Sequence, residues 1–298
     1  MTTDVTIVVA TRNRREQLLA LLPRHTAPVI VVDNGSEDGT PAAVAREFPR
    51  VRVVELGRNA GAGAARNVGV GLARTPYVAF ADDDSYWAPD ALSRAAALLR
   101  RHPRTALLTG EVRVGAAARR DPVTAAMARA PLGTEPDAPG PTVLGFLACA
   151  VVLRRDAYRQ VGGFAERLGT YGEEALLAMD LAAAGWNLAY VPELVAHHLP
   201  VPAGRDPRAR RRVEARNRVL TAALRRPGRV LREVVADAWR DPAGRAGLRD
   251  AARQAGWVLR HRRRLPAGLE SALAALARAE AVAPLSAGVP EPLGSTAA

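Results

Sequence analysis

The chain has 298 residues, of which 48% are hydrophobic and 24% charged, and it contains one cysteine. This composition is typical of a globular protein with a real core, and a single cysteine excludes a disulfide scaffold and a cysteine-based zinc site. The formal net charge is +12, and all 42 basic residues are arginine. The absence of lysine indicates a genome-wide coding bias of bacterial type. The positive charge is therefore weak evidence for nucleic-acid binding, and we do not expect nucleic acid as a partner.

The N-terminal segment does not resemble a secretion signal, because an acid precedes its apolar run and arginines follow it. The longest apolar run, at 144–153, is about half as long as a membrane span requires. These features predict a cytoplasmic protein that does not span a membrane.

Four short runs rich in valine and isoleucine recur early in the chain, at 5–10, 29–33, 51–56 and 77–81. Helical patterns lie between these runs, at 14–22, after Thr40 as an N-cap, and at 62–73. Strands and helices that alternate in this way predict an α/β fold with a doubly wound, mainly parallel sheet and helices on both faces.

Polar residues follow each of the four predicted strands. They are Thr11, Arg12, Asn13 and Arg14, then Asp33, Asn34, Gly35 and Ser36, then Arg58 and Asn59, and finally Asp82, Asp83 and Asp84. In open α/β sheets, ligands bind beyond the carboxyl ends of the strands. We therefore expect these groups to converge on one edge of the sheet and to suit a nucleotide.

The second part of the chain is less regular. Its patterns predict a helix at 90–101, a strand at 105–114, a variable loop at 115–142, a buried strand at 144–153, and helices at 154–164 and 172–186. From 207 to about 282 the pattern is helical, with breaks at Pro227-Gly228, Pro242 and Pro266.

The excess of arginine lies in one segment. Residues 205–264 contain 19 arginines and 6 acids, whereas the rest of the chain has 23 arginines and 24 acids. The simplest interpretation is a set of helices with solvated faces, whose arginine stems lie on apolar neighbours. The alternative is a surface for an anionic acceptor or for the inner face of the plasma membrane.

Three consecutive carboxylates after a strand are costly to collect, because like charges at short range raise the pKa of one another. A divalent cation removes this cost, and Mg²⁺ and Mn²⁺ both accept oxygen ligands. Alternate side chains of an extended loop point the same way, so Asp82 and Asp84 are the better placed pair for one cation. The alternative is a solvated acidic turn that precedes the helix at 90–101.

The stretch from Gly61 to Arg66 has part of the dinucleotide-binding fingerprint. Arginine replaces its third glycine, however, and the stretch follows the third predicted strand, whereas the fingerprint follows the first. We therefore exclude a Rossmann-type dehydrogenase. Asp33 ends the second strand, where a carboxylate can accept from a base N–H or a ribose hydroxyl.

Five strings, in their order along the chain, resemble the family 2 glycosyltransferases of the GT-A-type fold. They are VTIVVATRNR, VVDNGSEDGT, RNAGAGAARNVG, FADDDSYWAPD and VGGFAERLGTYGEE, and a late histidine pair follows them. The resemblance covers roughly residues 4–200. It implies an enzyme of glycan biosynthesis that binds a nucleotide-sugar through a divalent metal, Mn²⁺ or Mg²⁺, and transfers a hexosyl or deoxyhexosyl group with inversion.

The resemblance also implies a role for the residues that match its motifs. Asp84 binds the metal together with Asp82, and His197 and His198 lie in a region where family members often have a histidine at the metal or the diphosphate. The expected contacts with the nucleotide-sugar are Thr11 and Arg14 along the nucleotide, Asp33 at the nucleobase, and Arg66 at the nucleobase or the phosphates. Asn59 and Asp82 are also expected to contact the nucleotide-sugar. Asp83 is included as well, but it occupies the variable middle position of the motif and its role stays open.

The motif that carries the catalytic base, the group that takes the proton of the acceptor hydroxyl, differs from the family pattern. The family has Glu-Asp after a glycine at a helix start, whereas here Gly172 is followed by Glu173 and Glu174. Glu174 matches the Asp position and is the expected base, with Glu173 as the alternative, and a helix N-terminus favours the ionised form. Tyr171 and Trp186 are candidates for contacts with the acceptor.

The predicted organisation has three parts. Residues 1–204 form a catalytic domain, with a nucleotide-sugar half at 1–114 and an acceptor half at 143–204, followed by an Arg-rich helical extension at 205–283 and a disordered tail at 284–298. Expected partners are a nucleotide-sugar donor, a glycan, lipid-linked or small-molecule acceptor, and a membrane surface contacted by the Arg-rich helices.

Two other functions remain as alternatives. A sugar-phosphate nucleotidyltransferase would need an early Gly-rich triphosphate loop, and the segment after the first strand has no glycine. A non-catalytic protein could use the basic helices to bind an anionic surface.

Overall fold

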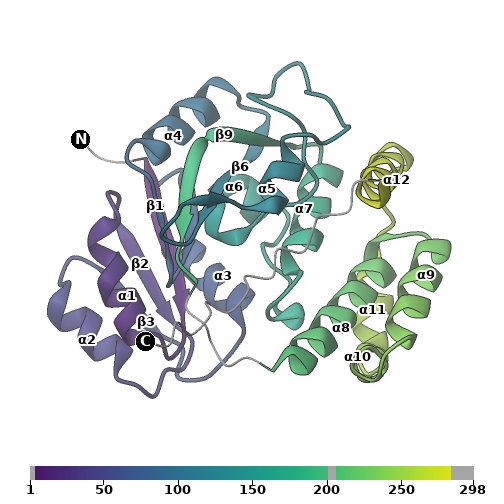
Figure 1. The fold of residues 1–298 in the computed structure, drawn as a ribbon, viewed down its shortest axis with the longest axis horizontal. Helices are drawn as coiled ribbons and strands as arrows, with labels where there is room; N and C mark the ends of the chain where they lie inside the picture. Colours follow the sequence, from purple (N-terminus) through teal and green to yellow (C-terminus); the bar gives the residue numbers. More distant parts are fainter. Residues whose placement is uncertain (1–3, 201–205, 283–298) are drawn as a thin grey trace, which may run out of the picture.

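Four parallel strands form the first half of the sheet in the computed structural model, which describes residues 4–200 and 206–282. They are β1 (Val5–Thr11), β2 (Val29–Asp33), β3 (Arg52–Glu55) and β4 (Tyr77–Asp82), in the order β3-β2-β1-β4. β1 and β4 are buried along almost their whole length, which explains why they are continuous apolar runs. The predicted α/β sheet is therefore confirmed (Figure 1).

Three helices connect these strands: α1 (Arg15–Leu21), α2 (Thr40–Glu47) and α3 (Ala62–Leu72). The predicted N-cap of α2 is wrong by one residue. Gly39, with φ 77°, is the N-cap, and Thr40 is the first helical residue. The carboxylate of Asp38 accepts both the backbone N–H and the hydroxyl of Thr40, so the capping group lies two residues earlier than expected.

The second half of the sheet is mixed. β4 pairs antiparallel with β8 (Val151–Arg154), which pairs antiparallel with β6 (Thr105–Val114). β6 then pairs parallel with β9 (Asn187–His198), whose end pairs antiparallel with the short β5 (Ser85–Trp87). The strand order thus continues β4-β8-β6-β9-β5, with α4 (Ala91–Arg101) over one face.

Two predictions for this half need correction. Of the strand predicted at 144–153, only its end is β8, because Ala148–Ala150 is a turn of 3₁₀ helix. The run is nearly all buried, but an apolar run alone does not distinguish a strand from a packed turn. The loop predicted at 115–142 contains β7 (Arg119–Arg120) and α5 (Pro122–Met127).

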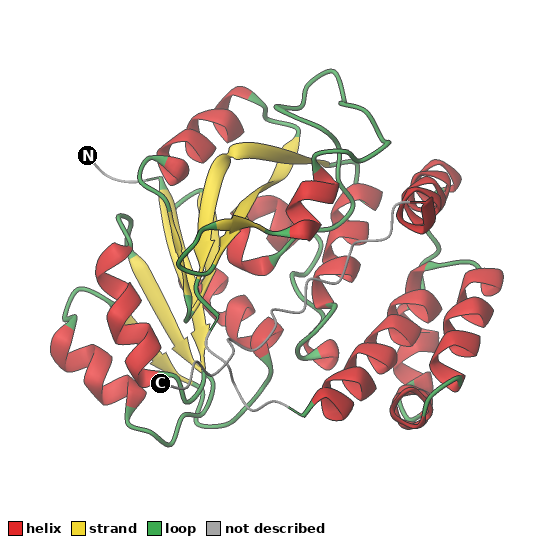
Figure 2. Cartoon of the chain, in the orientation of Figure 1, coloured by secondary structure: helices red, strands yellow, loops and turns green. Residues whose placement is uncertain are grey.

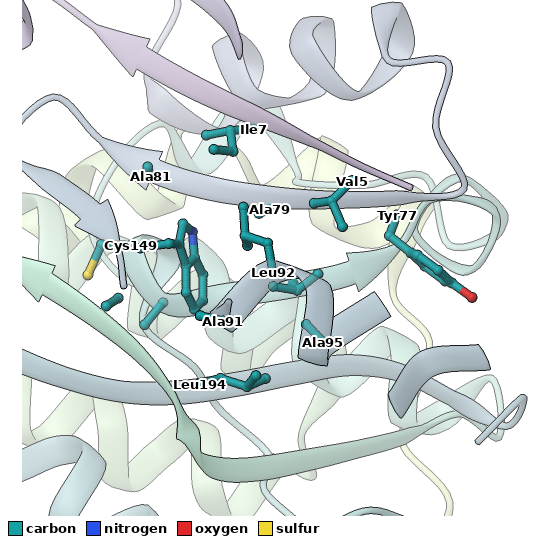
Figure 3. Packing of buried hydrophobic residues seen from close by; sticks show 14 of the residues in the cluster. Val5, Ile7, Tyr77, Ala79, Ala81, Ala91, Leu92, Ala95, Cys149 and Leu194 are labelled. Atoms are coloured by element: carbon teal, nitrogen blue, oxygen red, sulfur yellow. The ribbon is translucent and has the colours of Figure 1, made fainter. Parts of the chain in front are cut away.

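The two faces of the sheet carry separate hydrophobic cores. Alternate residues of β1 point to opposite sides, so Ile7 packs with α4 and Val8 packs with α3. Figure 3 shows the first core, where Ala79 of β4 lies near Leu92 of α4. The second core also receives α6 (Arg155–Gln160) and α7 (Glu173–Ala183).

The C-terminal region is helical, as predicted, and it lies beside α7 (Figures 1 and 2). Its helices are α8 (Pro207–Arg225), α9 (Gly228–Trp239), α10 (Pro242–Ala252), α11 (Ala255–His261) and α12 (Ala267–Val282). The three predicted breaks are observed, and a further one occurs at 253–254. Leu220 and Leu224 of α8 pack on Leu168 and Leu176 of the preceding part of the chain. The tail predicted to be disordered lies outside the described residues.

Many arginines of this region form ion pairs, within it or with α7. Arg211 pairs with Asp241, Arg212 with Asp250, Arg225 with Asp180 and Arg226 with Glu270. These contacts join α8 to α10, α7 and α12, so a part of the arginine excess stabilises the packing of the helices. The expectation of solvated faces holds for exposed arginines without such a contact, such as Arg260, Arg263 and Arg264.

Asn217 links α8 to the segment that precedes α7. Its buried amide donates to the backbone carbonyls of Leu168, Thr170 and Tyr171, at 2.9, 3.0 and 2.8 Å. The segment therefore has a fixed position relative to α8. Within the described part of the chain, no helix is both long and apolar enough to cross a membrane.

Candidate active site

A cleft of about 1030 Å³ opens at the carboxyl edge of the parallel strands. Its walls come from the ends of β1 and β4, the start of α7, the end of β9 and the first turns of α8. The sequence-predicted residues that line it are Thr11, Arg14, Asn59, Arg66, Asp82, Asp83, Asp84, Glu173, Glu174 and His198. Residues from both halves of the sheet therefore meet in one cleft.

Asp82, Asp84 and His198 form a group that could hold a metal ion. One ligand atom from each lies within 4.8 Å of the others, and Nε2 of His198 is 3.1 Å from Oδ1 of Asp84. The pairing of Ser85 with His198 in the β5–β9 ladder brings the histidine beside Asp84. Carboxylate and imidazole donors together fit a divalent cation such as Mn²⁺.

His198 is influenced strongly by these carboxylates. Burial lowers its pKa, but the bond to Asp84 and the charges of Asp84 and Asp82 outweigh burial, so its pKa lies above the usual value. Asp83 points elsewhere and accepts a hydrogen bond from the Thr11 hydroxyl at 3.0 Å. Burial, followed by the charge of Asp84, raises the pKa of Asp83 to about 7.

Arg66 is a buried cation between two carboxylates. Its guanidinium group donates to Oδ1 of Asp82 at 2.9 Å and to Oε1 of Glu173 at 3.1 Å, and the residue is 5% exposed. The rings of Phe80 and Phe164 lie 5.8 and 5.7 Å from the guanidinium carbon, close enough for cation–π contact. Arg66 therefore joins the carboxylates at the end of β4 to the start of α7.

The two glutamates at the start of α7 differ in their surroundings. Glu173 is 1% exposed, and its Oε2 has no hydrogen-bond partner among the described residues. Burial, and then the charge of Glu174, raises the pKa of Glu173 to about 7. Glu174 is half-buried in the cleft wall, and its carboxylate has no ion-pair partner in the described part of the chain. Burial raises the pKa of Glu174 as well.

Asp33 is buried and is not among the lining residues, but its neighbour Asn34 lines the cleft. Oδ2 of Asp33 accepts the backbone N–H groups of Gly35 and Ser36, and its buried Oδ1 has no partner in the described residues. Asn34 donates to Oδ1 of Asn59 at 3.0 Å. One oxygen of Asp33 is thus left for a donor that the described residues do not supply.

His197 lies outside the Asp82–Asp84–His198 group. Successive residues of a strand point to opposite sides, so His197 stacks on Tyr86, with ring centroids 4.8 Å apart. Of the two aromatic candidates for acceptor contacts, Tyr171 lines the cleft and lies under the guanidinium group of Arg210. Trp186 does not line it and donates to Gln160.

Several residues of the cleft are absent from the sequence-based set. They include Asp121, the segment Leu147–Cys149, and Asp206, Ala209, Arg210 and Val213 of the α8 region. Asp121 precedes a proline, which is a signal for a helix start, but that signal predicts a cap and gives no position. The α8 residues follow His198 closely in the sequence, but no local pattern predicts that they return to the cleft.

The fold and the site define a GT-A-type α/β enzyme, and solved structures share this architecture. The crystal structure of S. aureus TarS superposes with a TM-score of 0.59 at 18% identity, covering 97% of this chain and 75% of that one. The mannosyltransferase PcManGT from Pyrobaculum calidifontis, in complex with GDP-Man and Mn²⁺, has a TM-score of 0.58 at 23% identity, covering 94% and 80%.

The sequence places the chain more narrowly. The model of glycosyl transferase family 2 matches residues 6–162, and the chain belongs to this family. It is 32% identical over 226 residues to the N-acetylglucosaminyl-diphospho-decaprenol L-rhamnosyltransferase of Mycobacterium tuberculosis, which covers 63% of this chain and 72% of that protein. The protein is therefore an enzyme that transfers sugars, as the sequence motifs predict.

We predict that Arg66→Met lowers the free energy of unfolding by about 3–5 kcal/mol, because it leaves the buried carboxylate of Glu173 without its cation. Guanidinium chloride unfolding measures the change. The double variant Arg66→Met/Glu173→Gln should recover part of the loss, since it also removes one of the unpaired charges. A loss below about 1 kcal/mol in the single variant, typical of an exposed pair, would contradict this role of Arg66.

Proposed function

We propose that the enzyme transfers a sugar from a nucleotide-diphosphate sugar to an acceptor hydroxyl, with inversion at the anomeric carbon. The observation that carries this proposal is that a possible cation site, Asp82, Asp84 and His198, and the carboxylate of Glu174 line the same cleft. Inverting transfer needs groups of both kinds, on opposite sides of the reacting carbon.

The ends of β1, β2 and β3 bind the nucleotide in this proposal. Thr11, Arg14 and Asn59 line the cleft on that side. The unpartnered Oδ1 of Asp33 suits an N–H donor of the base, because a buried carboxylate oxygen without a partner is costly. Arg66 acts indirectly, since both of its carboxylate partners are protein groups and its side chain is almost fully buried.

Asp82, Asp84 and His198 would hold a divalent cation, and the imidazole ligand favours Mn²⁺ over Mg²⁺. When bound, such a cation supplies positive charge for the diphosphate as it departs. Glu174 takes the proton from the acceptor hydroxyl, whose oxygen forms the new bond to the anomeric carbon as the bond to the diphosphate oxygen breaks. Arg66 and Glu173 fix the start of α7 and thereby orient Glu174.

Each segment of the chain is assigned to the substrate that it would contact in this reaction. We assign residues 1–114 to the nucleotide-sugar half, 143–204 to the acceptor half and 205–283 to the helical extension. The contribution of Ala209, Arg210 and Val213 to the cleft wall supports a role for the extension in acceptor binding.

We predict that Asp84→Asn reduces Mn²⁺-dependent release of the nucleoside diphosphate from a nucleotide-sugar about 100-fold, because it removes a charged metal ligand. Coupled detection of the released nucleotide measures the rate. The matched control is Asp156→Asn, an exposed aspartate outside the cleft, which should retain full activity. Equal activity of Asp84→Asn and the wild type would exclude the metal-assisted reaction.

We predict that Glu174→Gln lowers kcat for transfer roughly 100- to 10,000-fold with unchanged affinity for the donor, since only the base is lost. Glu173→Gln is the isosteric control and should retain more activity. The carboxylate must be ionised to act as a base, so kcat/KM should fall as the pH decreases. Because the pKa of Glu174 is raised, this fall should begin at a higher pH than it would for an ordinary glutamate. The opposite ranking of the two variants would assign the base to Glu173.

The acceptor is proposed from the named relative, which by its name acts on a decaprenol-linked diphospho-sugar. We infer a lipid-linked acceptor and a contact between the C-terminal helices and the membrane that carries it. The contact surface is the 259–264 patch, which we define as Leu259, Arg260, Arg263 and Arg264. Leu259 is 77% exposed, and these arginines are exposed with no acidic partner in the described residues.

We predict that the triple variant Arg260→Gln/Arg263→Gln/Arg264→Gln binds vesicles containing anionic phospholipid about 100-fold more weakly, because each arginine near the surface contributes about 1 kcal/mol. Vesicle sedimentation measures binding. The control with equal net charge is Arg50→Gln/Arg52→Gln/Arg94→Gln, which neutralises three exposed arginines outside the C-terminal helices. Equal loss in both triple variants would contradict a specific patch.

A further inference from the structure

One part of the cleft has no role in the reaction described above. Asp121 and the segment Leu147–Cys149 line the same cleft as the Asp82–Asp84–His198 group. Asp121 follows β7 and its backbone N–H bonds to the carbonyl of Val112. Since Val112 pairs with Ala196, two residues before His198, Asp121 lies across β6 from the metal end of the cleft.

The segment Leu147–Cys149 lies at this end as well. The turn Ala148–Ala150 packs against β4, β5, β6 and β9, the strands that carry or adjoin the metal group. Ala148 and Cys149 are 5% and 6% exposed, and Leu147 is half-buried. Their side chains offer an apolar wall with no strong hydrogen-bonding group.

The carboxylate of Asp121 has one oxygen in use. Oδ1 caps α5 by accepting the backbone N–H groups of Val123 and Thr124, at 2.7 and 3.4 Å. Oδ2 has no hydrogen-bond or ion-pair partner in the part of the chain that the structure describes. The cap fixes the side chain, and the second oxygen is available to a ligand in the cleft.

A donor sugar has to lie at this end of the cleft. Its anomeric carbon is bonded to the diphosphate, and the proposed base Glu174 lines the same space. Among the cleft groups to which the reaction above gives no role are one hydrogen-bond acceptor, Oδ2 of Asp121, and one apolar wall, Leu147–Cys149. A buried hydroxyl against such a wall loses its hydrogen bonds with water, whereas a methyl group there gains from burial.

We propose that Asp121 and Leu147–Cys149 form the donor-sugar subsite, in which Oδ2 of Asp121 accepts from ring hydroxyls and the apolar wall contacts the methyl group of a 6-deoxyhexose. This inference rests on the proposed function, because the position of the sugar follows from the position of the diphosphate. The donor class is therefore a nucleotide 6-deoxyhexose, and a hexose with a hydroxymethyl group is disfavoured.

Binding in the presence of Mn²⁺ tests the proposal with pairs of donors that share a base. The probes are dTDP-L-rhamnose with dTDP-glucose, GDP-L-fucose with GDP-mannose, and the free nucleoside diphosphates dTDP, GDP and UDP. Thermal shift identifies which nucleobase the protein binds, and titration calorimetry then gives the affinities for the nucleotides. The wild type should bind the 6-deoxy donor about tenfold more tightly than the hexose donor of the same base.

In Asp121→Asn, the amide oxygen can still cap α5, and the NH₂ group then replaces the free oxygen. In the flipped orientation the NH₂ group takes the position of the capping oxygen. This variant should lower the affinity for the nucleotide-sugar about tenfold or more, and its affinity for the nucleoside diphosphate should stay within about twofold of the wild type. The matched control is Asp241→Asn, an N-cap aspartate of α10 outside the cleft, which should change neither affinity. Leu147→Asn adds a polar group to the wall and should abolish the preference for the 6-deoxy donor.

The outcomes separate the two levels of inference. If no nucleoside diphosphate binds the wild type, the proposed function fails. If the nucleotide binds but Asp121→Asn retains wild-type affinity for the nucleotide-sugar, the subsite is overturned while the proposed function stands. A wild-type preference for the hexose donor, or no effect of Leu147→Asn on selectivity, overturns the assignment of the 6-deoxy class.

Discussion

The site depends on a buried guanidinium group between two carboxylates. Arg66 comes from α3, Asp82 from the end of β4 and Glu173 from the start of α7, so one side chain joins the parallel and mixed halves of the sheet. Glu173 and the guanidinium group of Arg66 are buried, whereas the side chain of Asp82 is 35% exposed. Burying Glu173 without the cation, or the cation without Glu173, would be strongly unfavourable, so each of these two groups stabilises the other in this position.

The glycines of α3 make this contact possible. A Cβ on Gly61 would lie 2.7 Å from the Cα of Gly169, and a Cβ on Gly63 would lie 3.1 Å from the Phe164 side chain. The backbone N–H of Gly63 donates to the carbonyl of Gly169 at 3.1 Å. The partial dinucleotide fingerprint in this stretch thus has a packing role, and Asn217 holds the same 168–171 segment from the side of α8.

The sequence predicts those parts of the site that follow from local order. Asp82 and Asp84 end a continuous apolar strand, and the rule for parallel sheets brings them to the same edge as Thr11 and Asn34. Which histidine joins them depends on the register of β5 on β9, a long-range pairing that the adjacent pair His197-His198 cannot reveal. Likewise, Asp121 reaches the cleft because β7 pairs with β6 and β6 pairs with β9, and no spacing in its own loop predicts this.

The charge of the cleft explains why a cation fits this site. Among the described residues, seven carboxylates line it, from Asp82, Asp83, Asp84, Asp121, Glu173, Glu174 and Asp206, against four guanidinium groups, from Arg12, Arg14, Arg66 and Arg210. The pKa values of Asp83 and Glu173, both raised to about 7, reflect burial together with the repulsion within this set. An anionic diphosphate would add to the repulsion, whereas a divalent cation neutralises it and lowers the pKa of nearby carboxyl groups. In the proposed reaction, binding of a cation with the donor and ionisation of Glu174 would therefore be linked, because both require less negative charge at the end of β4.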